Sequence, residues 1–244
     1  MPEMQENFAR DLPSGSASHA SGALLGAAAV VVWNDVAAEG RDQFYDWHDK
    51  EHIPERLSIP GFRRGRRYSK RGQSPEWLTL YEASDLQVLV SPDYLRRLNA
   101  PTPLTVDTLR YFRNTSRAVC RVAGSLGSSS GAYVLALRLE VPEAQGARIR
   151  EDLLARIFPR AMGMTGVLAC HVLVADSQAS YTDTAESRTR AFDVPAWVVL
   201  VECSRPEAAE RARELMGMPN LQHLGVAMRE DGVVYTLEIC RLAS

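Results

Sequence analysis

The sequence predicts an α+β protein in which two tandem βαββαβ repeats pack sheet against sheet into a barrel. Three observations predict this fold. Residues 75–84 (PEWLTLYEAS) match residues 195–204 (PAWVVLVECS) at five of ten positions, at an offset of 120. At the same offset, VCRVA from Val119 matches ICRLA from Ile239. Both halves of the chain also show the same order of strand-like and helix-like patterns.

The earlier part of each half aligns at a shorter offset of 105, which pairs Pro54 with Pro159 and Gly61 with Gly166. The offsets differ by 15 residues, and this difference predicts an insertion in residues 178–194, whose Ser, Thr and Asp content is typical of a loop. The chain is therefore divided into four segments: a flexible tail (1–22), a first repeat (23–124), a linker (125–131) and a second repeat (132–244).

Hydrophobic periodicity predicts the elements of each half in turn. In the first half these are a strand (28–33), a helix (39–57), two strands (62–70 and 77–83), a second helix and a strand around Cys120. In the second half they are a strand (133–141), a helix (143–158), two strands (167–175 and 197–203), a second helix and a strand around Cys240. Each second helix is expected to begin at a capping box, formed by Ser84 with Gln87 and by Ser204 with Glu207.

The order βαββαβ is the ferredoxin-like plan, an antiparallel sheet with both helices on one face. The opposite face of such a sheet needs cover, and two such sheets within one chain can cover each other. The sequence therefore predicts that the repeats pack face to face and close into a barrel.

Composition excludes several classes of function. The formal net charge is −2 and the isoelectric point about 6.2, which predicts neither nucleic acid nor an anionic membrane as a partner. The longest apolar run, residues 24–33, is about half as long as a bilayer crossing requires. The four cysteines have no metal-site spacing and are expected to be free, buried thiols in a reducing cytoplasm.

The stretch EHIPERLSIPGF, residues 51–62, resembles the EthD-like branch of the dimeric α+β barrel superfamily through His52, Pro54, Pro60 and Gly61. The resemblance implies a ferredoxin-like barrel and a superfamily that includes cofactor-free monooxygenases, isomerases, cyclases and dehydratases, and haem proteins of two fused repeats. This chain departs from the usual single module per chain. We therefore expect no cofactor, and a site in the first half only, because Leu153 replaces His48 in the second half.

Phe44, Trp47, His48 and Glu51 are expected on one face of the first helix, with Tyr45 and His52 along its edge. Among them, His48, Glu51 and His52 are the candidates for chemistry, and Trp47 is a candidate for substrate binding. His52 and His48 are predicted to act as general acid or base, with Glu51 orienting or tuning them. The alternative is that these groups only satisfy one another and the end of the helix. A metal site, with a third ligand from Glu51, Glu55, His171 or His223, is not expected because the HExxH arrangement is absent.

The basic run RRGRRYSKR, residues 63–71, follows directly. Strand alternation places Arg66 and Tyr68 on one face, where they are predicted to bind the anionic or oxyanionic part of a substrate next to Trp47. The alternative is that this strand is a sheet edge whose charges deter aggregation. Glu82 and Glu202 occupy matched positions and are expected to have a structural role.

These observations predict a cofactor-independent enzyme of the cyclase, dehydratase, isomerase or monooxygenase type, acting on a small aromatic or polyketide-like substrate by histidine-mediated proton transfer. The alternative is a non-catalytic module that binds a small ligand or a protein. The expected partners are a small molecule and a second copy of the chain in a homodimer, with no metal, no nucleic acid and no membrane.

Overall fold

A computed structural model describes residues 23–189, 192–217, 221, 224–229 and 231–244. The predicted tail (1–22) and His223 lie outside the described residues. The strands are β1 (Ala28–Val36), β2 (Phe62–Ser69), β3 (Trp77–Ala83), β4 (Phe112–Gly127), β5 (Tyr133–Glu140), β6 (Val167–Ala175), β7 (Trp197–Cys203), β8 (Ala227–Met228) and β9 (Val233–Leu242). None of the helices in these described ranges is long and apolar enough to cross a membrane.

The strands form one antiparallel sheet in the order β7-β6-β4-β1-β3-β2-β9-β5-β8, and pairing of β7 with β5 closes eight of them into a barrel. The first four strands have the ferredoxin-like order β4-β1-β3-β2, and β9-β5-β7-β6 repeats it in the second half. Two seams join the halves, β4 with β6 and β2 with β9. The predicted fold class, two ferredoxin-like units forming an α+β barrel, is confirmed.

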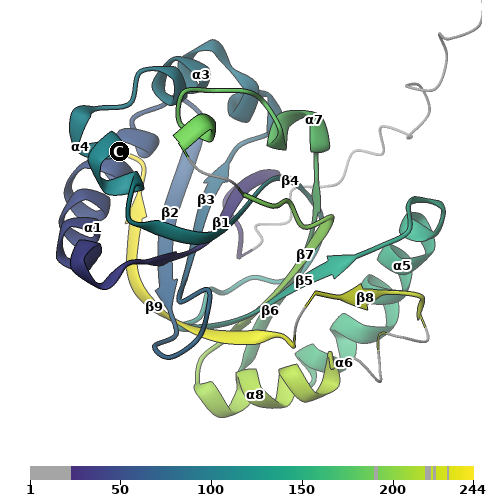
Figure 1. The fold of residues 1–244 in the computed structure, drawn as a ribbon. Helices are drawn as coiled ribbons and strands as arrows, with labels where there is room; N and C mark the ends of the chain where they lie inside the picture. Colours follow the sequence, from purple (N-terminus) through teal and green to yellow (C-terminus); the bar gives the residue numbers. More distant parts are fainter. Residues whose placement is uncertain (1–22, 190–191, 218–220, 222–223, 230) are drawn as a thin grey trace, which may run out of the picture.

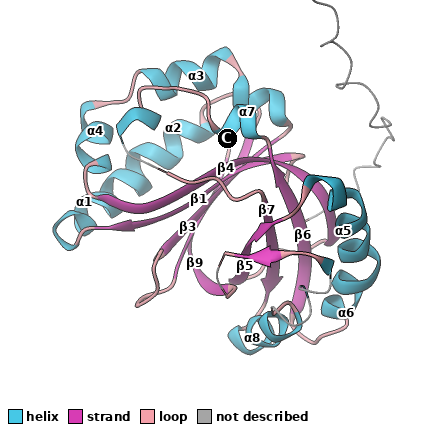
Figure 2. Ribbon diagram, turned by 45° about the vertical axis from the view of Figure 1, so that its right-hand side comes forward, coloured by secondary structure: helices cyan, strands magenta, loops and turns pink. Residues whose placement is uncertain are grey.

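Helices cover the outside of the barrel in two groups (Figure 2). The first group comprises α1 (Arg41–Trp47), η2 (His48–His52), α2 (Ile53–Leu57), η3 (Leu86–Val90), α3 (Pro92–Asn99) and α4 (Pro103–Leu109), preceded by η1 (Ala38–Gly40). The second comprises η4 (Glu143–Gln145), α5 (Gly146–Asp152), η5 (Leu153–Ile157), α6 (Phe158–Met162) and α8 (Pro206–Leu215). Helix α7 (Ser177–Ser180) and the short turn η6 (Ser187–Thr189) belong to the predicted insertion, and Figure 1 shows this part of the second half beside α3.

Alternation along the strands separates two cores. In β1, Ala29, Val31 and Trp33 point into the barrel, where residues of both halves form one apolar cluster. The intervening Val30 and Val32 face the helices of the first half. Every strand next to β1 follows the same rule, so a residue on one face of the sheet cannot reach the other face. This separation decides which side chains can share a site.

The first helical segment confirms the predicted helix and adds a feature that the sequence did not predict. Residues 41–57 are helical throughout, but His48–His52 form a π-helical turn. Pro54 follows directly after this turn, inside the continuous helical segment, so its missing N–H removes one intrahelical hydrogen bond to the preceding turn. The second half has a π-helical turn at Leu153–Ile157, the positions that the offset of 105 predicts. Duplication of one ancestral unit remains a prediction, but matched positions carry the same local structure.

Several local predictions are wrong. Asp85, not Ser84, caps the first helical turn after β3, and Arg205 begins α8 without a side-chain cap. Strand β4 continues to Gly127, into the segment predicted as a linker. All four cysteines are free, but Cys240 is exposed.

Strand β2 is not a sheet edge, because barrel closure pairs it with β9 as well as with β3. Arg64, Arg66 and Arg67 are consequently buried, and the edge interpretation of the basic run is wrong.

Candidate active site

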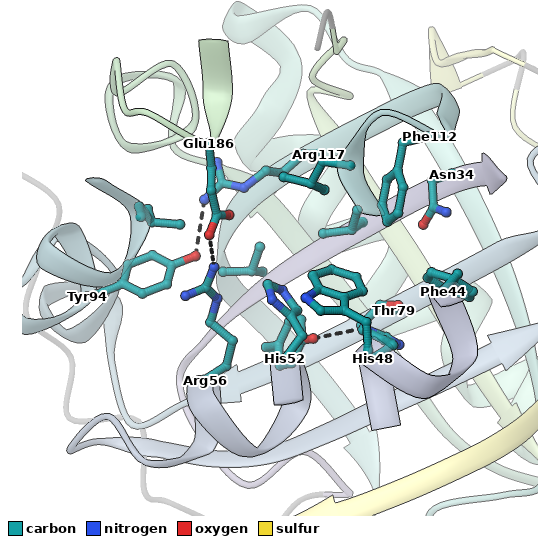
Figure 3. Close-up of a pocket in the computed structure, with 16 residues that line it drawn as sticks. Asn34, Phe44, His48, His52, Arg56, Thr79, Tyr94, Phe112, Arg117 and Glu186 are labelled. Carbon is teal, nitrogen blue, oxygen red and sulfur yellow. Dashed lines mark hydrogen bonds and ion pairs between the residues drawn. The ribbon is translucent and has the colours of Figure 1, made fainter. Parts of the chain in front are cut away.

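A cavity lies outside the barrel, between the sheet of the first half and the helices that cover it (Figure 3). The space that the centre of a water molecule can reach measures about 50 Å³. At ~10–15 Å³ of this space per water, the cavity holds about four waters. Four waters in the liquid occupy about the volume of one aromatic ring. The walls are mainly aromatic and aliphatic: Val30, Val32, Phe44, Trp47, Tyr81, Tyr94, Leu98, Leu109 and Phe112.

His48 and Tyr81 form the buried polar wall of this cavity. His48 Nε2 lies 3.0 Å from Tyr81 Oη, and His48 Nδ1 lies 3.0 Å from Arg67 Nη1. Because a guanidinium can only donate, Nδ1 must accept, and the proton of the neutral imidazole is assigned to Nε2. Nε2 then donates to Tyr81, so the hydroxyl hydrogen of Tyr81 is left to donate into the cavity.

Burial sets the protonation of this pair. Desolvation, followed by the positive charges of Arg67 and Arg56, lowers the pKa of His48 well below its usual value. Desolvation likewise raises the pKa of Tyr81 far above its usual value. At neutral pH the pair is therefore an imidazole and a phenol, and His48 holds Tyr81 as a hydrogen-bond donor rather than acting as a base.

His52 lines the cavity one helical turn after His48, and its ring lies over Trp47 with a centroid distance of 4.2 Å. It is half-buried, whereas His48 is 4% exposed. Figure 3 shows the His52 ring between the cavity and the helix that carries it. Of the two histidines, His52 is the one placed to exchange a proton with a molecule in the cavity.

The Glu51 side chain contacts α4 and the residue that caps it. Its carboxylate accepts hydrogen bonds from the hydroxyls of Thr102 and Thr105, and Thr105 also accepts from Trp47 Nε1 at 2.9 Å. Because Thr102 caps α4, these contacts fix the π-helical turn against that helix. The geometry gives Glu51 a part in positioning Trp47.

The opposite end of the cavity is charged, and it combines both halves of the chain. Arg56 of α2 forms an ion pair with Glu186 of the insertion and contacts Glu55 at 3.3 Å. Arg117 of β4 lies beside them and donates to Tyr94 Oη and to the Ser180 carbonyl, both at 3.3 Å. A second, smaller cavity shares the wall formed by Leu98, Arg117 and Glu186.

Arg66 and Tyr68, the predicted substrate-binding residues, lie on the other face of the sheet, inside the barrel. Arg66 Nη1 is 2.8 Å from Glu202 Oε1, and its Nη2 is 3.0 Å from Glu82 Oε1. The two glutamates accept the backbone N–H groups of Leu25 and Gly131, each just before the first strand of its half. Arg66 and Tyr68 therefore do not share the cavity with Trp47, His48 and His52.

Sequence reasoning missed the residues that complete the site: Arg56, Arg67, Tyr81, Arg117 and Glu186. Tyr81 lies in the repeated strand block and alternates with Leu80, so strand parity could have placed it on the helix-covered face. The same parity separates Arg67 from Arg66. Nothing in the sequence connects Glu186 with Arg56, because they are 130 residues apart.

The described part of the chain contains no group of three or more His, Cys, Asp or Glu arranged to hold a metal ion. His171, one of the third ligands considered, lies inside the barrel, where its Nδ1 is 2.9 Å from Ser125 Oγ. In the second half, Leu153 and Phe158 of the matched helical segment pack into the apolar core, and neither side chain can ligate a metal ion.

Acidification is expected to destabilise the fold through His48 and His171. Burial and the nearby arginines lower the pKa of His171 to about 3, and that of His48 also falls. Below about pH 6.5 these histidines bind protons in the unfolded chain but stay neutral in the folded chain. The free energy of unfolding therefore falls with pH, by up to about 1.4 kcal/mol per pH unit per histidine. Urea unfolding between about pH 7 and pH 4 measures this, and His171→Gln should give a shallower slope. Equal slopes in both proteins would contradict the assignment.

Neither a protein-family model nor a curated protein sequence matches this chain. Solved structures do match. An anthrone oxidase-like protein gives a TM-score of 0.57 at 14% identity, covering 88% of this chain and 92% of the other. A proposed monooxygenase from Lactobacillus acidophilus NCFM gives 0.52 at 12%, covering 89% and 96%. A mutant chlorite dismutase from Candidatus Nitrospira defluvii, in complex with cyanide, gives 0.51 at 13%, covering 88% and 91%. These likenesses extend over nearly the whole chain and show a shared fold.

Proposed function

We propose that this chain, which has the dimeric α+β barrel fold, is a cofactor-independent enzyme that removes a proton from a carbon next to a carbonyl in a small aromatic or polyketide-like substrate. The supporting observation is the cavity of the first half, where His52 and the Tyr81 hydroxyl face one space with aromatic walls. An acceptor for the proton and a donor for the developing enolate oxygen are the two groups that such a step requires.

Each residue has a separate part in this proposal. His52 takes the proton as general base. Tyr81 donates its hydrogen bond to the oxygen on which negative charge develops, and His48, held by Arg67, fixes the direction of that bond. Trp47 and Phe44 supply flat apolar contact for the ring. Proton removal is the step that cyclisation, dehydration, isomerisation and oxygenation of such compounds share, so the site supports this class rather than one member.

Two of the structural neighbours are named for oxygen chemistry, the anthrone oxidase-like protein and the proposed monooxygenase. Their names agree with a carbanion as the first intermediate, which supports the proposal at the level of chemistry. The EthD-like assignment, a homodimer and a cytoplasmic location remain predictions.

Hydrogen–deuterium exchange tests the function directly. We expect the wild-type protein, in D₂O under nitrogen, to accelerate exchange of the CH₂ protons of two neutral carbon acids, methyl phenylpyruvate and anthrone, measured by NMR. The first has the single ring that the cavity can hold, and the second requires the walls to move apart. Heat-unfolded protein provides the baseline.

If the protein accelerates exchange of neither compound above this baseline, the result would contradict an enzyme of this type. If quenching of tryptophan fluorescence still reported binding of methyl phenylpyruvate, the non-catalytic ligand-binding module would become the better interpretation of the same cavity.

A further inference from the structure

Arg117 differs from the other arginines around the two cores. Arg56, Arg64, Arg66 and Arg67 are all buried, and each has at least one carboxylate within ion-pair distance. Arg117 is half-buried, and within the described part of the chain it forms no ion pair. Its two hydrogen-bond partners are neutral, the Tyr94 hydroxyl and the Ser180 carbonyl, both at the long distance of 3.3 Å.

The position of Arg117 makes this charge available to a ligand. Arg117 pairs with Val32 in β1 and lines both cavities, at the wall between them. The charged residues that line the larger cavity are Arg56, Arg117 and Glu186, and Arg56 forms ion pairs with Glu186 and with nearby Glu55. Arg117 is therefore the cationic lining residue that has no carboxylate within ion-pair distance among the described residues.

A partly desolvated guanidinium without a counter-ion favours an anion more strongly than an exposed one does. Tyr94 adds a second donor, because its oxygen accepts from Arg117 and its own hydrogen is left to donate. From this arrangement we propose that the ligand of the pocket is an aromatic carboxylate, whose carboxylate binds Arg117 and Tyr94 while its ring occupies the larger cavity beside Trp47 and His52. The inference rests on the function proposed above, for which it names the class of substrate.

The contributions of the ligand's charge and of its ring to binding can be measured separately with two ligands that differ in one group. Phenylpyruvate and its methyl ester have the same ring and the same acidic CH₂ group, but only the acid carries a charge. We expect wild-type protein to bind phenylpyruvate roughly 10- to 100-fold more tightly than the ester, the range of a charge-assisted hydrogen bond. Quenching of tryptophan fluorescence, with Trp47 in the cavity wall, measures both dissociation constants.

Three variants assign the preference to Arg117. Arg117→Gln should bind the ester as wild type does and lose the preference for the acid, and Arg117→Lys should keep part of it. Arg121→Gln is the matched control, since Arg121 lies on the same strand but is exposed. Unchanged ester binding also shows that the Gln variant keeps its fold. Equal wild-type binding of acid and ester, or a full preference in Arg117→Gln, would overturn the proposal.

The outcome is independent of the exchange experiment on neutral compounds. A charge preference lost in Arg117→Gln, without catalysed exchange, would retain the anion site and reject the enzyme. Catalysed exchange of the ester without a charge preference would retain the enzyme and reject the anion site.

Discussion

Replacing His52 with glutamine is expected to slow catalysed proton exchange by about 10²- to 10⁴-fold, the usual contribution of a general base. Glutamine keeps the size and polarity of the side chain but cannot take up a proton near neutral pH. Binding of methyl phenylpyruvate should change little, because the aromatic contact with Trp47 and Phe44 remains. The expected loss is therefore in kcat, with KM nearly unchanged.

Tyr81→Phe gives a second, separable loss. Removing one donor to a developing oxyanion costs about 10²- to 10³-fold in kcat, and the ring of phenylalanine leaves the packing intact.

Lys50→Ala is the control for His52→Gln, because Lys50 belongs to the same π-helical turn but is exposed. A loss in Lys50→Ala equal to that in His52→Gln would show that the helix, and not the imidazole, governs the rate.

Replacing Arg66 with methionine is expected to lower the free energy of unfolding by about 3–5 kcal/mol, the cost of breaking a buried ion pair from one side. Arg66 is 1% exposed and bridges Glu82 and Glu202 across the barrel. Glu82 keeps Arg64 at 2.8 Å, but among the described residues Glu202 would keep only the Gly131 N–H and neutral His171 at 3.8 Å. Most of the cost therefore falls on Glu202.

Urea unfolding near pH 7 measures this loss, and two comparisons make it specific. Arg63→Met, an exposed arginine of the same strand, should change stability by less than about 0.5 kcal/mol. Adding Glu202→Gln to Arg66→Met should recover part of the loss, because it removes the uncompensated charge. A loss in Arg66→Met no larger than that in Arg63→Met would show that the barrel interior does not depend on this network.

The sequence determined the order of the elements and the repetition of that order. Hydrophobic periodicity is a local property, so strands such as residues 77–83 and 197–203 could be predicted with their bounds. The offset of 105 also predicts that residues 153–157 match His48–His52, and both stretches form π-helical turns. The candidate residues Trp47, His48 and His52 were placed on one helical segment for the same local reason.

Only the tertiary structure decided which residues meet. Strand alternation predicts that Arg66 and Tyr68 share a face of β2. Because β2 pairs with β9 in the closed barrel, that face points into the barrel. Arg67 and Tyr81 lie on the opposite face, which the helices cover. Glu186 reaches Arg56 because the insertion of the second half folds over the first. Side-chain periodicity is fixed by backbone geometry within a strand or helix, whereas strand pairing across the chain depends on the whole sheet closing. The sequence of WHDKEH therefore located the site along the chain, and the closed barrel decided which other side chains surround it.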